Sequence, residues 1–531
     1  MRFRRLATPL FLTASLLLAA TPAGAQVVSR VSERPDGSEL PFGQAFSPTI
    51  SADGRRVVFA RTDGLWSKDL QTGALDHLLA SFLSINPSSM SADGRYVLFT
   101  SIDELLVPDK SNLCWAVAFG APRRVACLDL FVLDIASRTV ARIFGPEGVQ
   151  ISANSSGVMS ADGRWIVIAR ELRTEPVPAG PHQLLLQDRT TGVTTVIGSS
   201  LDRAPSISAD GRRVAFVRTT VTGSVSANNV LVYDRVSGAT ERADVDLPGA
   251  TTVLLNAQLS GDGSVVAFEA SGSGCSVGPI SRIFIRDLEW KRTSEPMREA
   301  HPCGNFELSG ISREGRFVLF ESGTPNLVAD DPAFGDVFVV DRLSGAIARA
   351  SRGAAQPDGV SFGASVSGDG LRVVFTSQAL NLLPRRAQWE NHVYLASLDL
   401  DADGMADAWE RYFGLSPADR ADAAADADGD GVVTADEYRL GMHPRGPFRL
   451  RTTGAVVNPD TSRVLLRNFG SRDAVLWLRA VDAQGRWFAS PVTLGPRQTT
   501  IFPITGLMNR PPGNFTLHVE SDQPVRAGLS R

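Results

Sequence analysis

The sequence contains few of the residues and motifs on which common enzyme classes depend. Its 531 residues include only six histidines and four cysteines. No H-E-x-x-H zinc motif occurs, and the G-x-S-x-G strings from Gly274 to Gly278 and from Gly359 to Gly363 lack the strand-to-helix context of a nucleophile elbow. No long segment has a 3.6-residue apolar period, and no alternation of strands and helices is present. These absences weigh against an α/β hydrolase and against a zinc protease.

Long apolar runs are also scarce, and the one that exists lies at the start. Basic residues precede an apolar run from Leu6 to Ala20, and Ala23-Gly24-Ala25 has the small-x-small form of a signal-peptidase site. Arg4-Arg5 fits a twin-arginine signal poorly. No later stretch reaches the roughly 20 apolar residues that span a bilayer. We expect residues 1–25 to be a signal peptide and the protein to be exported, either periplasmic or secreted to the cell surface, with no transmembrane segment.

The four cysteines fall into two local pairs, Cys114 with Cys127 and Cys275 with Cys303. An oxidising compartment favours disulfides, and each pair brackets an insertion. A zinc site would need C-x-x-C spacing, which is absent. We expect disulfides, although four cysteines allow three pairings.

The positive signal is a repeated hairpin. The stretch S-A-D-G-R-R-V-V-F begins at Ser51, and its Asp-Gly pair suits a tight turn before a strand with one buried face. Related copies begin at Ser91, Ser160, Ser208, Ser260, Ser312 and Ser367. Spacings of 40 to 69 residues are typical of propeller blades. The sequence therefore predicts an all-β fold, a seven-bladed β-propeller over residues 26–398.

The two ends of this region predict how the ring closes. After the seventh hairpin the chain forms one apolar strand, from His392 to Leu398, and then changes composition without supplying a fourth strand. The segment Val27 to Ser32 precedes the first hairpin and has no blade of its own. We expect it to pair with His392–Leu398 and complete the last blade, which removes exposed sheet edges.

The hairpins S-x-D-G-x-x-V-x-F resemble the WD-repeat-like propeller repeats of the TolB type. The stretch N-L-V-A-D-D-P-A-F-G-D-V-F-V-V-D from Asn326 resembles bacterial exported versions of that repeat. The resemblance covers roughly residues 27–398. It implies a β-propeller that most often serves as a binding platform.

The aspartates of these turns could be read as metal ligands. They are Asp53, Asp93, Asp162, Asp210, Asp262 and Asp369. Aspartate before glycine commonly hydrogen-bonds its own backbone, and single carboxylates on separate blades do not converge on one ion. We therefore interpret them as turn residues.

Two later stretches have the ligand spacing that those turns lack. A calcium loop needs oxygen ligands at positions 1, 3 and 5, glycine at 6, a backbone carbonyl at 7 and a carboxylate at 12. The first loop supplies Asp399, Asp401, Asp403, Met405 through its carbonyl, Asp407 at position 9, and Glu410. The second supplies Asp426, Asp428, Asp430, Val432 through its carbonyl, Thr434 at position 9, and Glu437.

The charge between Asp399 and Glu437 supports a metal-binding role. Twelve acidic residues face two arginines, a local net charge of 2 − 12 = −10. Residues 399–444 resemble dockerin-like or thrombospondin type 3-like bacterial calcium modules, with helical material after each loop. We expect an EF-hand-like segment that binds two structural Ca²⁺ ions, against the alternative of a solvated acidic linker.

Residues 445–531 differ again. Short apolar strands between Pro, Gly and Asp turns predict a β-sandwich module. From Arg449 to Arg531, eleven arginines and five acidic residues give a net charge of +6. This module could bind an anionic polysaccharide or lipid headgroups, or simply present scattered arginines to solvent.

Two functions from different classes remain open. The favoured one is an exported, calcium-binding, non-enzymatic platform that binds a protein or glycan at the propeller face. The alternative is a propeller hydrolase or lyase acting on polysaccharide or peptide with carboxylates at the funnel. The overall charge of −4 does not indicate a nucleic-acid partner. We expect a monomer, with no residue yet assignable to catalysis.

Overall fold

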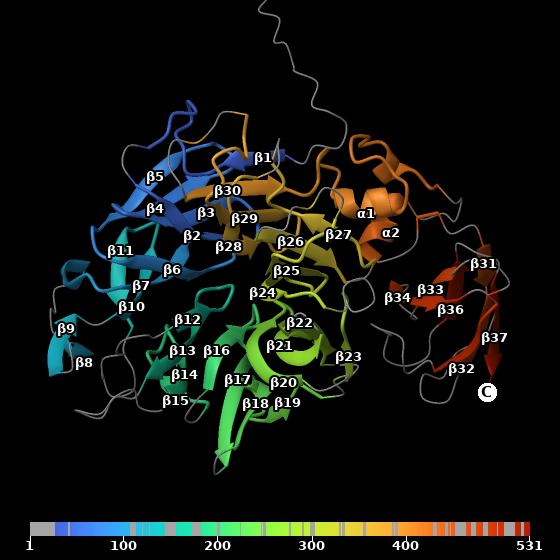
Figure 1. Ribbon diagram of the computed structural model, residues 1–531, viewed down its shortest axis with the longest axis horizontal. Helices are drawn as coiled ribbons and strands as arrows, with labels where there is room; N and C mark the ends of the chain where they lie inside the picture. Colours follow the sequence, from blue (N-terminus) through green and yellow to red (C-terminus); the bar gives the residue numbers. More distant parts are fainter. Residues whose placement is uncertain are drawn as a thin grey trace, which may run out of the picture.

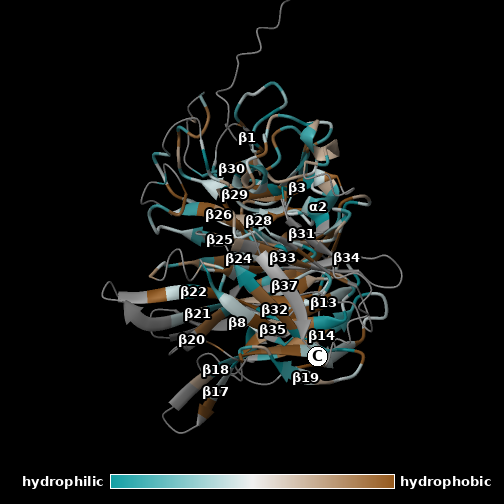
Figure 2. Cartoon of the chain, turned by 90° about the vertical axis from the view of Figure 1, so that its right-hand side faces the viewer, coloured by the Kyte–Doolittle hydropathy of each residue, from teal (hydrophilic) through white to brown (hydrophobic). Residues whose placement is uncertain are grey.

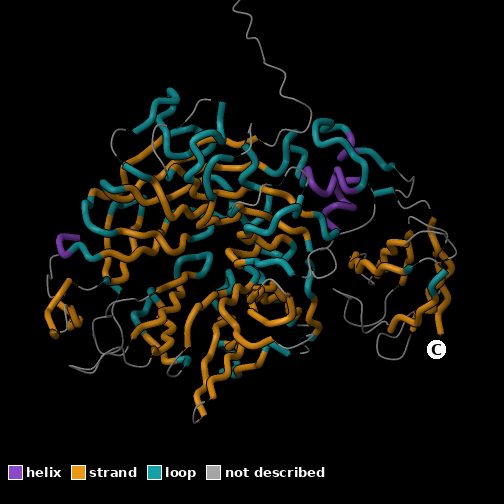
Figure 3. Tube along the Cα trace, viewed as in Figure 1, coloured by secondary structure: helices purple, strands orange, loops and turns teal. Residues whose placement is uncertain are grey.

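The computed structural model describes most of the chain from Val27 onward. The described residues are 27–40, 43–106, 113–118, 121–126, 128–143, 156–171, 182–198, 202–222, 225–245, 247, 251–275, 278–288, 291–297, 303–328, 331, 335–342, 344–353, 357–384, 387, 391–427, 433–440, 444–445, 448–451, 463–468, 474–481, 487–495, 497–503, 516–521 and 525–530. Strands dominate, and the α-helices lie in the acidic segment (Figure 3).

Seven four-stranded antiparallel sheets form the blades of a propeller (Figure 1). Blades one to three contain β2 (Ala45–Ile50), β3 (Arg56–Arg61), β4 (Gly64–Asp69) and β5 (Leu75–Ala80); β6 (Ile85–Met90), β7 (Tyr96–Ser101), β10 (Asp129–Asp134) and β11 (Thr139–Arg142); and β12 (Ser156–Met159), β13 (Trp165–Glu171), β14 (His182–Asp188) and β15 (Thr194–Val196). Blades four and five contain β16 (Asp202–Ile207), β17 (Arg213–Thr222), β18 (Val225–Asp234) and β19 (Thr240–Arg242); and β20 (Thr251–Leu259), β21 (Val265–Cys275), β22 (Gly278–Asp287) and β23 (Arg292–Ser294).

Blade six contains β24 (Glu307–Ile311), β25 (Phe317–Ser322), β26 (Asp336–Asp341) and β27 (Ile347–Arg349). Blade seven contains β28 (Ser361–Val366), β29 (Arg372–Ser377), β30 (His392–Ser397) and β1 (Val27–Arg30). The insertion in blade two carries a 3₁₀ turn (Glu104–Leu106) and the separate hairpin of β8 (Leu113–Ala118) and β9 (Ala121–Ala126). The predicted count of seven blades is confirmed.

The ring closes as the sequence predicts. β1 pairs antiparallel with β30, with Val27 opposite Ser397 and Arg30 opposite Tyr394. The Val31 N–H then donates to the carbonyl of Val393 at 2.8 Å. The first strand of the chain is thus the outermost strand of the last blade, and it covers the sheet edge of β30.

The Ser-x-Asp-Gly turns link each blade to the next. In the first turn, the Asp53 carboxylate accepts hydrogen bonds from the Ser51 hydroxyl at 2.5 Å and from the Arg55 N–H at 3.0 Å. The carboxylate is thus committed to its own turn, which confirms the structural interpretation of these aspartates. Gly54 adopts φ +67°, and its carbonyl accepts from Nη1 of Arg372 at 2.8 Å, so blade seven is bonded to blade one.

Apolar cores fill the spaces between neighbouring blades. Between blades seven and one, Val57 and Phe59 pack with Val374 and Val393, all of them fully buried. Each sheet packs between two neighbours, so its inner strands are buried on both faces rather than on the one face that the sequence suggested: every residue of β26 is buried. In side view, the hairpins β17–β18 and β21–β22 project beyond the other strands (Figure 2).

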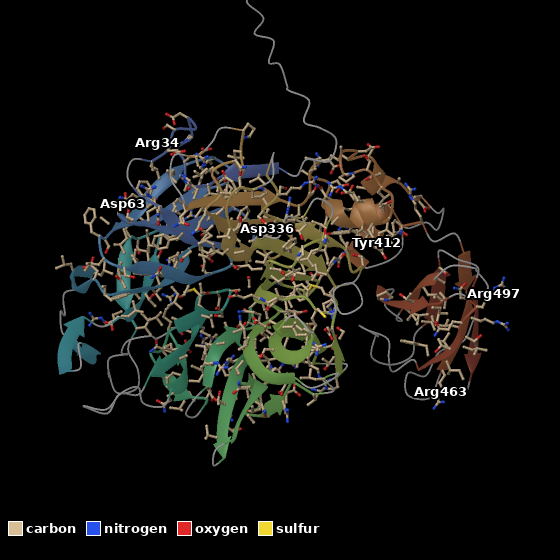
Figure 4. The ribbon with its side chains drawn as sticks, viewed as in Figure 1. Arg34, Asp63, Asp336, Tyr412, Arg463 and Arg497 are labelled. Carbon is tan, nitrogen blue, oxygen red and sulfur yellow. The ribbon has the colours of Figure 1, made fainter. Side chains whose placement is uncertain are left out.

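The acidic segment and the carboxyl-terminal strands follow β30. The acidic segment contains α1 (Asp407–Tyr412), a 3₁₀ turn (Asp422–Ala424) and α2 (Thr434–Leu440). The last part forms one sheet of β31 (Phe448–Arg451), β36 (Thr516–Ser521), β33 (Ala474–Val481) and β34 (Trp487–Leu494), and another of β35 (Thr499–Pro503), β32 (Arg463–Asn468) and β37 (Val525–Ser530). Val464, Leu466, Leu476 and Leu478 contribute to a shared apolar core between them. Arg463 and Arg497 point away from this core (Figure 4).

Two further expectations can be compared with the described residues. No helix among them is long and apolar enough to cross a membrane. Cys303 is the cysteine whose side chain is described, and it is not a free thiol. The side chains of Cys114, Cys127 and Cys275 lie outside the described part, so both pairings remain predictions.

Candidate metal centre

The two acidic loops begin and end in equivalent ways. At position 9 of each loop, a backbone N–H donates to the carbonyl of the residue before position 1. These bonds run from Asp407 to Leu398 and from Thr434 to Ala425, both at 2.8 Å. Helices α1 and α2 start at these positions. Because a loop and the first turn of a helix share the same residues, the position-12 glutamate is carried one turn into each helix.

The described part of the first loop brings four carboxylates together. Ligand-competent oxygens of Asp399, Asp401 and Asp403 lie within 4.8 Å of one another, and so do those of Asp403, Glu410 and Asp422. Asp403 belongs to both groups and therefore joins them. Four of the residues predicted from spacing thus converge, and a fifth carboxylate comes from outside the loop.

The loop backbone holds these carboxylates in place. Asp399 accepts from the Gly404 N–H at 2.9 Å, and Asp403 accepts from the Met405 N–H at 2.8 Å. Gly404 adopts φ +92°, a conformation that favours glycine and bends the loop back over its own acidic residues. One oxygen each of Asp401 and Asp403 remains buried without a hydrogen-bond partner.

Glu410 is the residue that most needs a cation. It is 0% exposed, and neither of its carboxylate oxygens has a hydrogen-bond partner. A buried charge is normally paired, hydrogen-bonded or bound to a metal. The groups that face it are the carboxylates of Asp403 and Asp422. This arrangement is unfavourable unless a proton or a cation neutralises the cluster.

The pKa values in the cluster show the same conflict. Burial, followed by the neighbouring charges of Asp403 and Asp401, raises the pKa of Glu410 to about 9. Burial and the nearby aspartates raise the pKa of Asp403 to about 6. The ion-free cluster therefore retains protons that a divalent cation would displace.

The predicted residues at positions 7 and 9 of this loop play different parts. Asp407 accepts hydrogen bonds from the Leu400 N–H at 2.8 Å and from Arg411 at 3.0 Å, and it is not one of the clustered carboxylates. Its carboxylate anchors the loop to α1. Met405 has a fully buried side chain, as expected if it contributes only its backbone carbonyl.

The second loop is described at its two ends. Asp428, Asp430 and Val432 lie outside the described residues. Asp426 is exposed, and Glu437 is 0% exposed on α2. The Thr434 hydroxyl donates to the Ala425 carbonyl at 2.8 Å. The two loops thus share the closing backbone bond and a fully buried glutamate at position 12.

Asp422 was missed by reasoning from spacing, because it lies between the two twelve-residue loops. One of its oxygens accepts from the Ser416 N–H at 3.1 Å, and the other is buried without a hydrogen-bond partner. The 3₁₀ turn Asp422–Ala424 brings the Asp422 carboxylate to Asp403 and Glu410. No spacing rule for a single loop could have found it.

The chemistry of the donors fits calcium. All five clustered side chains offer carboxylate oxygens, whereas zinc sites rely on histidine and cysteine. Calcium accepts six to eight oxygens in flexible geometry, and an unpartnered glutamate at position 12 can bind in bidentate fashion. A bound calcium ion would supply the positive charge that this cluster lacks.

The acidic segment also packs directly on the propeller. Met405, Trp409 and Tyr438 belong to one buried apolar cluster with Phe317 and Phe375 of blades six and seven. Arg316, which precedes β25, donates from Nη1 to the Tyr438 carbonyl, and its guanidinium carbon lies 3.9 Å from the centre of the Tyr438 ring. In Figure 1, α1 and α2 lie beside β26 and β27.

The strand pairing defines a seven-bladed β-propeller, here joined to an acidic two-loop segment. No protein-family model matches the chain, and no curated protein does. Similar solved structures include an oligogalacturonate lyase from Vibrio parahaemolyticus, with 13% identity, 70% of this chain and 93% of that chain covered, and a TM-score of 0.47.

Two other solved structures are similar to this chain at comparably low sequence identity. The β-propeller domain of the Trilobed protease from Pyrococcus furiosus shares 14% identity over 67% of this chain and 93% of its own, with a TM-score of 0.44. TolB from Acinetobacter baumannii shares 16% identity over 67% of this chain and 79% of its own, with a TM-score of 0.34. These neighbours differ in function, so the fold alone assigns none.

Proposed function

We propose that this protein is an exported β-propeller whose acidic segment binds two structural Ca²⁺ ions and whose ring is a non-enzymatic platform for a protein or glycan partner. The observation that carries the metal assignment is Glu410, which is fully buried among carboxylates with both oxygens unpartnered. Calcium outside the cell is abundant enough to fill even weak sites.

The position of the segment supports a role as a clamp. α2 contacts blade six through Arg316, and α1 is joined to β30 of blade seven through the first acidic loop. Calcium at the first loop would hold Glu410 of α1 to the 3₁₀ turn that precedes α2, by neutralising the carboxylates that meet there. The ion would therefore help to keep the segment folded against blades six and seven.

Two glutamates at the blade junctions support a platform over the alternative hydrolase or lyase. Glu269 is buried and accepts from the Ser281 hydroxyl at 2.6 Å and from the Leu308 N–H of the next blade at 3.1 Å. Glu321 accepts from the Ser309 hydroxyl at 3.0 Å. Both glutamates are committed to hydrogen bonds within and between blades.

One described histidine, His392, lies within hydrogen-bonding distance of a serine hydroxyl, as the base and the nucleophile of a hydrolase would. The Ser32 hydroxyl lies 3.0 Å from Nδ1 of His392, but Ser32 is 0% and His392 3% exposed. The same hydroxyl accepts from the Val393 N–H at 3.1 Å. This pair is sealed inside the closure of the ring, which supports a structural role for it.

The metal assignment is tested on the full chain after treatment with a chelator. We expect calorimetric titration with CaCl₂ to show two ions per chain, and Glu410→Gln to lose one of them. Asp419→Asn is the matched control, because Asp419 is an exposed carboxylate of the same segment outside the cluster. No binding by the wild-type protein at millimolar calcium would refute the assignment.

The platform role has a separate test. Immobilised calcium-loaded protein is exposed to cell-envelope extract, and a retained partner is then titrated as a purified component. We expect the purified partner to bind the wild-type protein saturably. The Glu410→Gln variant should bind it only if the acidic segment stays docked on the propeller. Turnover of a polysaccharide or peptide by the purified protein would favour the enzymatic alternative instead.

A further inference from the structure

An arginine–aspartate pair recurs on five blades, on the face of the propeller that carries the Ser-x-Asp-Gly turns and their equivalent in blade six. Each arginine follows the glycine of a turn, and each aspartate ends the third strand of the same blade. The pairs are Arg55–Asp69, Arg95–Asp134, Arg164–Asp188, Arg212–Asp234 and Arg316–Asp341. Three of these pairs, on blades two, three and six, use Nε and Nη2 together in a fork, which leaves Nη1 pointing away from the aspartate.

The same three blades place an aromatic ring beneath the guanidinium. The guanidinium carbon of Arg95 lies 4.8 Å from the ring centre of Tyr96, that of Arg164 lies 5.0 Å from Trp165, and that of Arg316 lies 5.1 Å from Phe317. Blades one and four carry Arg56 and Arg213 at this position. A flat guanidinium held on an aromatic face and by a carboxylate fork has little freedom to move.

Blade six shows what such a unit binds. The guanidinium carbon of Arg316 lies 3.9 Å from the centre of the Tyr438 ring, and Nη1 donates to the backbone carbonyl of the same tyrosine. Tyr438 lies in the last turn of α2, whose carbonyls lack partners within the helix. The Arg316 side chain is consequently only 10% exposed.

Blades two and three present the same unit uncovered. The side chains of Arg95 and Arg164 are 50% and 44% exposed, and within the described residues Nη1 of each makes no hydrogen bond. A second arginine also holds each ring, because the guanidinium carbon of Arg189 lies 3.9 Å from the centre of the Tyr96 ring and that of Arg235 lies 3.9 Å from the centre of the Trp165 ring. Each unit is therefore preorganised before any partner arrives.

We propose that blades two and three bind a protein partner through the carboxyl-terminal turn of a helix that carries an aromatic residue. Arg95 and Arg164 would each form one such site, donating Nη1 to a free helix carbonyl and stacking against the aromatic ring of the helix end that it binds, as Arg316 does with Tyr438. This proposal rests on the proposed function of the ring as a platform, and it names the surface and the chemical class of the partner.

The local charge favours a polypeptide over a polyanion. The exposed turn carboxylates Asp93 and Asp162 alternate with the two arginines, and each arginine is already paired with Asp134 or Asp188. This surface lacks the excess positive charge that nucleic acids and acidic glycans require. A backbone carbonyl and an aromatic ring carry no net charge, so their binding does not require an excess of positive charge.

The test uses the full-length, calcium-loaded protein and a defined peptide probe. The probe is a helix-stapled copy of residues 433–440 in which 4-fluorophenylalanine replaces the tyrosine. Its ¹⁹F linewidth is measured against increasing protein, since one stacking contact and one hydrogen bond give an affinity in the millimolar range. We expect roughly twofold line broadening with the wild-type protein.

Matched variants identify the surface. Arg95→Lys with Arg164→Lys keeps the charge but removes the planar fork, so the broadening should disappear. Arg55→Lys with Arg212→Lys alters equivalent pairs on blades without the aromatic ring and should leave the broadening unchanged. Equal loss in both double variants, or loss only in Arg316→Lys through exchange into blade six, would overturn the proposal.

The outcome also separates this surface from the broader function. In one outcome the ¹⁹F signal of the peptide does not broaden, while a purified envelope partner still binds saturably and its binding is unaffected by Arg95→Lys with Arg164→Lys. The proposed platform function then stands, and the assignment of this surface is wrong. If that partner's binding is lost in the same double variant but retained in the control, both proposals are supported. An acidic polysaccharide that competes with the peptide would contradict the assignment to a polypeptide.

Discussion

Tyr438 of α2 covers the Arg316 guanidinium of blade six, with 3.9 Å between the guanidinium carbon and the ring centre. The same arginine forms a forked pair with Asp341 at 3.0 and 2.8 Å. One side chain therefore links the third strand of a blade to a helix more than 90 residues later in the chain. The acidic segment is fastened to the ring at this point as well as through the buried cluster around Trp409.

This contact predicts the effect of Arg316→Ala. Removal of the arginine leaves Asp341 buried at 3% side-chain exposure and removes the support of Tyr438, which should cost about 3 kcal/mol in the free energy of opening the segment. Native-state trypsin cleavage at Arg420 reports this opening. Arg212→Ala on blade four removes an arginine that is 48% exposed and should cost less than about 1 kcal/mol. Equal cleavage rates in the two variants would argue against the anchor.

Asp422 provides a prediction specific to the tertiary structure. Asp422→Asn should weaken calcium binding at the first loop about tenfold or more, because a charged oxygen ligand is lost while the side-chain volume is kept. Calorimetric titration measures the change. Asp419→Asn, three residues earlier and outside the cluster, should keep the wild-type affinity. Identical affinities for the two variants would remove Asp422 from the ligand set.

Ala402 offers a stabilising change. It adopts φ +61° at position 4 of the first loop, where an L-residue with a side chain is strained, whereas the second loop has Gly429 at this position. Ala402→Gly should therefore stabilise the segment by about 1 kcal/mol, read again from trypsin cleavage at Arg420. Ala408→Gly in α1 should act in the opposite direction by about 1 kcal/mol, because glycine is unfavourable inside a helix. A destabilising effect of Ala402→Gly would show that the strain is absent.

His392 predicts a dependence of stability on pH. Burial first, and then the charges of Arg30 and Arg61, lower its pKa from 6.5 to about 4. The unfolded chain binds this proton below pH 6.5 and the folded chain does not, so the contribution is present above pH 6.5 and is lost as the pH falls through 4. The loss amounts to roughly 3 kcal/mol.

The comparison that tests this dependence is between variants. His392→Asn should have a smaller loss of stability between pH 6.5 and 4 than the wild-type protein in urea unfolding. Asp336, whose pKa burial raises to about 6, acts in the opposite direction over the same range, so wild-type data alone are insufficient. Exposed His77→Asn is the control and should follow the wild-type curve. A variant His392→Asn that also follows it would contradict the prediction.

Local sequence patterns predicted much of the fold. The Ser51 turn and its copies correctly gave seven blades, because an Asp-Gly turn and the strand after it depend on neighbouring residues only. Counting strands also predicted the pairing of Val27–Arg30 with His392–Ser397, since a blade with three strands needs a fourth. The twelve-residue spacing predicted four of the clustered carboxylates, because all of them lie in one loop of fixed geometry. The signal peptide, the disulfide pairings and the bound calcium remain predictions.

The sequence alone determined the repeat, the place of ring closure and the acidic loops, since each is encoded within a short span or by a simple count. Tertiary structure alone decided that Asp422 joins Glu410 and that Arg316 meets Tyr438. Neither contact follows from a spacing rule, because each depends on how a separate segment packs in space. The same packing distinguishes Arg316, which is covered, from Arg95 and Arg164, which follow the same turn glycine and stay open.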